Sequence, residues 1–165
     1  MKKRLILATA LFSLGLVACQ QHNPANTSVS TTPNDHSASA LTEQNKKIVV
    51  DFYEGVFSKH QVQTYSDRYI GIQYIQHNPY VADGKAPFVN YFTQYFKEHP
   101  DAKNTIKRVV AEGDLVVLHV HSTQNAQDRG EAVVDIFRVE QGKIVEHWDV
   151  IQSIPAESAN RNTMF

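Results

Sequence analysis

Residues 131–152 read EAVVDIFRVEQGKIVEHWDVIQ, two runs of alternating apolar and polar residues joined by Gln141-Gly142. Alternation with a period of two is typical of β-strands that bury one face. Glycine can adopt the positive φ that a tight hairpin turn requires. The stretch therefore predicts an antiparallel hairpin. Counting outward from its turn pairs Asp135 with Trp148, which places a carboxylate beside an indole.

Asp135 is the unusual residue of this hairpin, because it lies in the middle of a strand, where aspartate is disfavoured. Its predicted face is otherwise apolar and contains Val133, Phe137, Val139 and Ile144. An ionised carboxylate among apolar groups is costly unless it has a partner. We therefore expect a functional role for Asp135. The alternative is a buried acid that bonds to a neighbouring tyrosine or histidine.

The N-terminus, MKKRLILATALFSLGLVAC, has three basic residues, an apolar run and small residues before a cysteine. It resembles a bacterial lipoprotein signal, which implies that residues 1–18 are removed and that Cys19 is lipidated. Gln20 rather than aspartate follows the cysteine, which in Gram-negative lipoproteins implies the outer membrane, facing the periplasm. An uncleaved anchor and an ordinary secretory signal are the alternatives. The apolar run is short for a transmembrane helix of about 20 residues.

Charge and cysteine content exclude several classes of function. Without the signal, 13 basic and 17 acidic residues give a net charge of −4, which argues against nucleic acid as a partner. Cys19 is the only cysteine, so intramolecular disulfides and cysteine-cluster metal sites are excluded. Residues 20–40 are rich in Ser, Thr, Asn and Pro, which predicts a disordered tether.

The rest of the chain suits one α+β domain of residues 41–155, followed by a C-terminal tail of residues 156–165. Helices are predicted at residues 43–57, 61–67 and 87–99, and extended segments at residues 69–76, 105–112 and 115–123, before the hairpin. Helices followed by a run of antiparallel strands favour a sheet that packs on helices.

The order YIQHNP, DG, GDLVVLHVH and DIFRVEQGKIVEHWDV resembles the SnoaL-like branch of the nuclear transport factor 2-like superfamily over residues 41–155. The resemblance implies a cone, in which a curved antiparallel sheet wraps over about three N-terminal helices and leaves a pocket inside. It also implies a homodimer formed through sheet faces. His147 and Asp149 alternate with Trp148, so we expect them to face away from Asp135, toward such a dimer contact.

The resemblance assigns candidate catalytic residues. His119 and His121 share one face of the strand at residues 115–123. SnoaL-type polyketide cyclases use an aspartate before the Gly-Lys turn and a histidine on the preceding strand, and the matching positions are Asp135 and His121. The implied chemistry needs no cofactor: a proton is removed next to a carbonyl, and the enolate closes a ring. His119 is assigned to substrate binding or structure.

Four further residues are expected around the substrate. His77 and Asn78 follow a tyrosine-rich strand at the expected mouth of the cone, although Asn-Pro is also a common start of a turn. Tyr74 could donate a hydrogen bond to an enolate oxygen, and Trp148 is expected to form part of the pocket wall.

Two alternatives stay open from the sequence. His119 and His121 have the i, i+2 spacing of a strand that gives two ligands to a metal, with His77 and Asp135 completing the site. We nevertheless expect no metal. The cone could also bind a small apolar or carbonyl-containing ligand, or a protein partner, without catalysis.

Overall fold

The computed structural model describes residues 33–165, and their side chains from residue 36 onward. The predicted signal peptide, the lipidation site Cys19 and most of the predicted tether therefore lie outside the described residues.

Three helices and five strands make up the described chain, in the order helix, helix, strand, helix and then four strands. They are α1 (Pro33–Phe57), α2 (Val62–Tyr69), β1 (Ile70–Gln76), α3 (Lys85–Glu98), β2 (Lys103–Glu112), β3 (Leu115–Thr123), β4 (Glu131–Glu140) and β5 (Lys143–Ser153). The predicted α+β order is confirmed. None of the described helices is long and apolar enough to span a membrane.

Helix α1 begins within the segment predicted to be a tether, before the predicted helix start at residue 43. Its buried residues recur three or four positions apart and form one apolar stripe, Val49, Phe52, Tyr53 and Val56. Burial of this stripe against the sheet stabilises α1. The residues before this stripe are mostly exposed.

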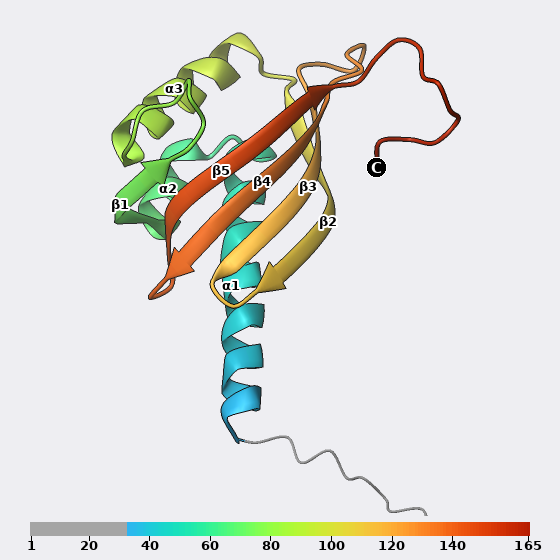
Figure 1. Cartoon of the computed structure of the whole chain (residues 1–165). Coiled ribbons are helices and arrows are strands. Elements are labelled where there is room, and N and C mark those ends of the chain that lie inside the picture. The colour runs from blue at the N-terminus through green and yellow to red at the C-terminus, as the bar shows by residue number, and fades with distance from the viewer. Residues whose placement is uncertain (1–32) are drawn as a thin grey trace, which may run out of the picture. The chain divides into compact units, whose positions relative to one another are not determined.

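The sheet has the strand order β1-β5-β4-β3-β2. Strands β2 to β5 pair antiparallel in sequence, whereas β1 pairs parallel with β5, so the expected antiparallel sheet is in fact mixed. Figure 1 shows the curved sheet with the helices on one of its sides. The β1 strand lies at the edge next to β5, although α3 and the strands β2, β3 and β4 come between β1 and β5 in the sequence.

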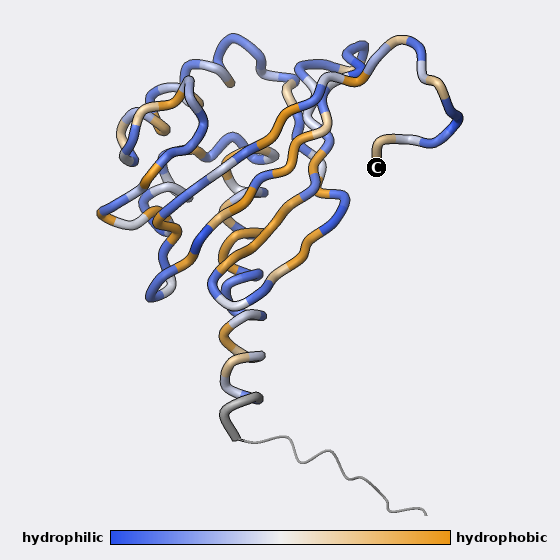
Figure 2. The backbone as a smooth tube through the Cα atoms, in the orientation of Figure 1, coloured by the Kyte–Doolittle hydropathy of each residue, from blue (hydrophilic) through white to orange (hydrophobic). Residues whose placement is uncertain are grey.

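The hydrophobic core lies between the helices and the inner face of the sheet. Strand residues alternate in burial along β3 and β4, and Figure 2 shows apolar positions recurring along both strands. The inward residues include Val116, Leu118, Val120, Val133 and Phe137. Facing them are aromatic rings of α1 and α3, among them Phe52, Phe57, Phe88, Phe92 and Phe96.

The hairpin turn forms where the sequence predicts it. Gln141 and Gly142 both have positive φ, of 50° and 75°, and Glu140 pairs with Lys143. A turn with two positive φ values matches the right-handed twist of the two strands.

A β-bulge follows on β5 and changes the register. Val139 pairs with Ile144, but the next residue of β4, Arg138, pairs with Glu146. Val145 is therefore an extra residue without a partner on β4. An insertion of one residue moves every later side chain of β5 to the opposite face from the one counted from the turn.

The bulge decides which residues surround Asp135. Asp135 pairs with Asp149 and not with Trp148, so the predicted pairing with an indole is wrong. His147 and Asp149 lie on the inner face with Asp135, and Trp148 lies on the outer face. The expectation that His147 and Asp149 face away from Asp135 is wrong for the same reason.

Candidate active site

A cavity of about 350 Å³ lies between the inner face of the sheet and the helices. Its size is within the range of small-molecule sites. The helix side is aromatic, with Phe88, Tyr91, Phe92 and Tyr95 of α3, and the sheet side carries Asp135, His147 and Asp149. An apolar cavity with a few converging polar groups is the expected form of a binding or active site.

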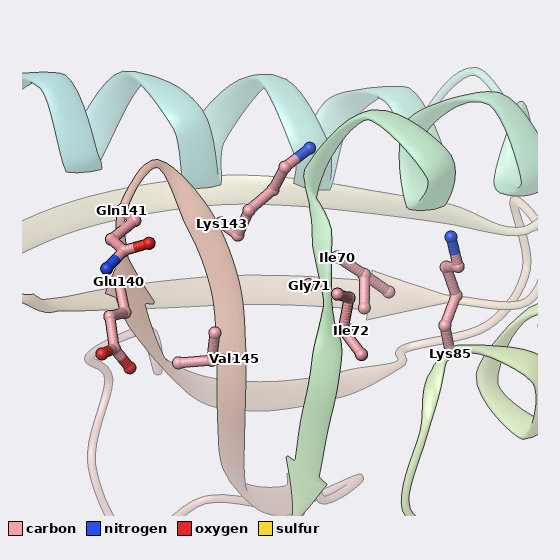
Figure 3. A pocket seen from close by; sticks show the side chains of 8 residues that line it. All are labelled: Ile70, Gly71, Ile72, Lys85, Glu140, Gln141, Lys143 and Val145. Carbon is pink, nitrogen blue, oxygen red and sulfur yellow. The ribbon is translucent and has the colours of Figure 1, made fainter.

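A larger hollow of about 660 Å³ lies outside this cavity, along β1 and the start of β5. Figure 3 shows that its charged side chains, Lys85, Glu140 and Lys143, lie apart and do not converge on one point. We place the functional site in the smaller cavity, because only there do ionisable groups converge on buried apolar space.

Asp135 is the buried acid of the cavity, with 6% of its surface exposed. Its Oδ2 accepts a hydrogen bond of 2.8 Å from the Tyr53 hydroxyl, and its Oδ1 lies 3.0 Å from Nε2 of His147. A carboxylate oxygen has two acceptor positions, so each oxygen keeps one for a ligand in the cavity that Asp135 lines.

His147 connects Asp135 to β1. Its Nδ1 lies 2.9 Å from Oε1 of Gln76, whose amide nitrogen donates to the Tyr74 hydroxyl over 3.4 Å. An imidazole that faces acceptors at both nitrogens donates at both only when it carries two protons. The contact between Nε2 and Oδ1 joins an imidazole and a carboxylate directly, which is the geometry that proton transfer requires.

Tyr53 fixes the other side of Asp135. Its hydroxyl donates to Asp135 and accepts from Nδ2 of Asn104 over 3.1 Å. Burial raises the pKa of Tyr53 well above its ordinary value of 10.0, and the negative charge of Asp135 raises it further. Tyr53 therefore stays protonated and orients the carboxylate.

Tyr74 has a hydroxyl proton that a ligand could use. The side chain is 2% exposed and lines the cavity, and burial raises its pKa, followed by the charges of Asp135 and Asp149. Its oxygen accepts from Gln76, but no described group accepts its proton. Tyr74 can thus donate to a ligand oxygen, whereas Tyr53 already donates to Asp135.

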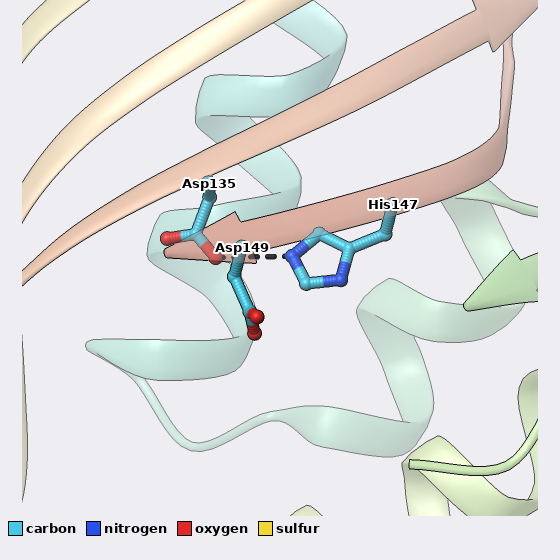
Figure 4. Close-up of side chains that lie close together, drawn as sticks. All are labelled: Asp135, His147 and Asp149. Carbon is cyan, nitrogen blue, oxygen red and sulfur yellow. Dashed lines mark hydrogen bonds and ion pairs between the residues drawn. The ribbon is translucent and has the colours of Figure 1, made fainter. Parts of the chain in front are cut away.

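Asp149 adds a second carboxylate beside this pair. Its Oδ2 accepts a hydrogen bond of 2.7 Å from Nδ2 of Asn78. Figure 4 shows Asp135, His147 and Asp149 close together, and one ligand atom of each lies within 4.8 Å of the others. Histidine and carboxylate are ligands for several divalent metals, so these three side chains could also hold a metal ion.

The expected pair of His121 and Asp135 does not form. Leu118 is the β3 residue opposite Asp135, so the inner face of β3 carries Leu118 and the histidines lie on the outer face. His121 bonds to the backbone oxygen of Arg129 over 2.8 Å, and His119 to Arg108. The face of the two histidines and the face of Asp135 are thus opposite sides of one sheet.

His77 and Trp148 also lie away from the cavity. Their rings stack on the outer face, with centroids 4.6 Å apart, and His77 bonds to Glu146 over 2.8 Å. The expectations that His77 faces the pocket and that Trp148 forms its wall are therefore wrong. Asn78 and Tyr74 do line the cavity.

The metal site considered from the sequence does not assemble either. His119 and His121 lie on the outer face of β3, and Asp135 lies on the inner face of β4. His77 bonds to Glu146 instead.

The residues that sequence reasoning missed are those that surround Asp135, namely Tyr53, Gln76, Asn104, His147 and Asp149. His147 and Asp149 were missed because of the bulge at Val145. Alternation counted from the turn without a bulge places both side chains on the outer face of the sheet, whereas they lie on the inner face. The local sequence does not mark the bulge, so strand alternation alone gives no signal for these two residues. Tyr53 lies on the apolar stripe of α1, and a tyrosine in such a stripe gives no sign of a site residue.

A curved mixed sheet on three helices, with a polar pair inside the curl, places the protein among cone-shaped α+β pocket domains of the nuclear transport factor 2-like class. Within this class the chain belongs to the SnoaL-like polyketide cyclase family, whose model matches residues 47–160. No curated protein sequence matches the chain.

Solved structures with this fold are distant in sequence. An NTF2-like protein of unknown function from Mesorhizobium loti is 19% identical, with a TM-score of 0.57 over 68% of this chain and 93% of that one. A SnoaL-like protein of unknown function from Burkholderia thailandensis is 13% identical, with a TM-score of 0.56 over 68% and 98%. TsrD from Streptomyces laurentii is 17% identical, with a TM-score of 0.54 over 66% and 88%. At these identities the likeness shows the fold alone.

Proposed function

We propose that the cavity is an active site that moves a proton next to the carbonyl group of a small molecule, without a cofactor. The observation that carries the proposal is the buried pair of Asp135 and His147, which lines the cavity and is held by Tyr53 and Gln76. A carboxylate and an imidazole that are hydrogen-bonded beside an apolar cavity form an arrangement suited to proton transfer. Membership of the SnoaL-like family supports this class of reaction.

Each group has a defined task in this reaction. The Asp135 carboxylate takes a proton from the carbon beside the carbonyl, and the C–H electron pair becomes the double bond of an enolate. The Tyr74 hydroxyl donates a hydrogen bond to the enolate oxygen, where negative charge develops. Asp135 then returns the proton to a different carbon, which is isomerisation. Alternatively, the enolate carbon attacks a second carbonyl carbon, the π electrons of that carbonyl move to its oxygen, and Asp135 returns the proton to this oxygen, which is aldol ring closure.

A binding protein without turnover is the second candidate function. The observation in its favour is that both oxygens of Asp135 already accept a hydrogen bond, from Tyr53 and His147. A structural acid needs no more than these bonds.

Deuterium exchange separates the two functions. The full-length protein is incubated in heavy water with a panel of cyclic and aryl ketones, and loss of the proton signal next to the carbonyl is followed by NMR. We expect exchange above the rate in buffer, unchanged by a chelator. Exchange that a chelator abolishes would indicate metal chemistry at Asp135, His147 and Asp149, and no exchange with any ketone would favour the binding protein.

We also propose that the protein is anchored in the cell envelope through a lipid on Cys19, at the outer membrane and facing the periplasm. The lipoprotein-like signal of residues 1–19 supports this. Cys19→Ser should leave the chain in the soluble fraction after cell fractionation, whereas the parent chain sediments with membranes. Membrane retention of the unprocessed variant would indicate an uncleaved anchor instead.

We further propose that the protein forms a homodimer through the outer face of the sheet. The outer face of the sheet exposes Val110 and Val150, with 63% and 66% of their surface accessible. Exposed apolar side chains on one sheet face support a contact between copies of the chain.

A further inference from the structure

The cavity carries an excess of negative charge that the proton-transfer reaction does not use. Three carboxylates line it, those of Glu131, Asp135 and Asp149, and no lysine or arginine is among its described lining residues. The only group there that can become cationic near neutral pH is His147, which is bonded to Asp135. Even with His147 protonated, two negative charges remain without a positive partner in the cavity.

Asp149 is the centre of this excess. It lies directly opposite Asp135 in the register of β4 and β5, and like charges at opposite positions are destabilising. Its Oδ2 is bonded to the neutral amide of Asn78, and its Oδ1 has no hydrogen-bond partner among the described residues. Neither Asp149 nor Glu131 forms an ion pair within the described chain. A bound cation would relieve this repulsion.

The helix side of the cavity is lined by aromatic rings that can contact the body of such a cation. Tyr91 and Tyr95 of α3 have nearly parallel rings, with an angle of 14° and centroids 6.2 Å apart, and Phe92 packs edge-on against Tyr91. Tyr91 is 56% exposed, and Tyr80 in the loop before α3 is 94% exposed, so both are accessible from solvent. Aromatic faces attract ammonium groups, most strongly where water is excluded.

We propose that the ligand of this cavity is an organic ammonium ion, with an apolar body against the α3 rings and its charged nitrogen near Asp149. The proposal deepens the proposed function, since it names the substrate class of the same cavity. An anionic ligand, such as a free carboxylic acid, is disfavoured because it would meet the carboxylates of Asp135 and Asp149 in a site of low dielectric.

Three probes of one shape test the charge preference. They are meta-hydroxyphenyl trimethylammonium, its neutral isostere meta-tert-butylphenol, and the anion meta-hydroxybenzenesulfonate, and binding to the full-length protein is measured by calorimetry in the presence of a chelator. We expect the cation to bind at least about tenfold more tightly than the neutral isostere. The anion should bind least. Equal or weaker binding of the cation, or no binding of it at millimolar concentration, would overturn the proposal.

Matched variants identify the charge partner. Asp149→Asn keeps the size of the side chain and its bond with Asn78, and it should bring the ratio of cation to neutral affinity close to one. Asp101→Asn removes the same charge from an exposed turn outside the cavity and should leave the ratio unchanged. A ratio that Asp149→Asn leaves intact, or that Asp101→Asn lowers equally, would show that Asp149 is not the partner.

The binding measurements with the three probes do not depend on whether the protein is an enzyme. None of the three probes has a carbonyl group, so their binding does not require proton transfer by Asp135. If the protein prefers the cation but exchanges no ketone proton, the ammonium ligand is supported and the proton-transfer function is contradicted. If it exchanges ketone protons but shows no preference for the cation, the proton-transfer function is supported and the ammonium ligand is contradicted.

Discussion

Replacement of Asp135 by asparagine should slow deuterium exchange of a substrate ketone by about 10²- to 10⁴-fold, the range that a positioned general base contributes. The reason is that an amide cannot accept the proton that the carboxylate takes. The measurement is the exchange rate of the ketone that responds best to the parent protein, followed by NMR at constant pH.

The variant should nevertheless fold, which makes the loss of turnover interpretable. Asparagine has the shape of aspartate, so its oxygen can accept from the Tyr53 hydroxyl. Its amide nitrogen can donate to Nε2 of a neutral His147, whose Nδ1 then donates to Gln76. We therefore expect the midpoint of thermal unfolding to change by no more than a few degrees, as for the loss of about 1 kcal/mol in a domain of this size.

His121→Ala is the control for this prediction. His121 lies on the outer face of β3 and bonds to the backbone of Arg129, away from the cavity. Its removal should leave the exchange rate unchanged. If His121→Ala slows exchange as much as Asp135→Asn, the chemistry does not occur in this cavity, and exchange that survives in Asp135→Asn would remove the acid from the mechanism.

The fold could be predicted from the sequence because it depends on patterns that repeat. Periodic apolar residues set α1 and α3, and Gln141-Gly142 sets the hairpin turn that the structure contains. Asp135 was also identified correctly as buried, since a single acid in an apolar face is visible in the sequence. Each of these features can be recognised from a short stretch of sequence without knowing how the strands pair.

The site could be predicted only in part, because its composition depends on register. One unpaired residue, Val145, places Asp149 instead of Trp148 opposite Asp135 and brings His147 to the same face, and nothing in the local sequence marks the bulge. The face of His121 depends on how β3 aligns with β4, where Leu118 meets Asp135. Tyr53 comes from a helix 82 positions away in the sequence, and only packing brings it to the acid.

The bulge makes His147 the second residue whose loss should have a large effect. His147→Gln should slow ketone exchange by about 10²-fold, the lower end of the range for proton transfer, because Asp135 is still present. Glutamine can place an amide nitrogen near the position of Nε2 and so keep a hydrogen bond to Asp135, but it cannot gain or lose a proton. Comparison of His147→Gln with the parent protein thus separates two roles of His147, exchange of a proton and positioning of the Asp135 carboxylate.

The pH dependence of the rate distinguishes a chemical role of His147 from a structural one. If His147 exchanges a proton during the reaction, the rate in the parent protein should depend on pH. In His147→Gln, one limb of the pH–rate profile should disappear. A profile of unchanged shape, lowered equally at every pH, would mean that His147 only holds the cavity together.

A double variant tests whether the two residues act as one unit. If His147 works through Asp135, then Asp135→Asn together with His147→Gln should be no slower than Asp135→Asn alone, because the second change removes a function already lost. Independent contributions would instead multiply, giving a further loss of about 10²-fold. Since Nε2 of His147 lies 3.0 Å from Oδ1 of Asp135, and Gln76 holds the other ring nitrogen, the contacts favour the non-additive result.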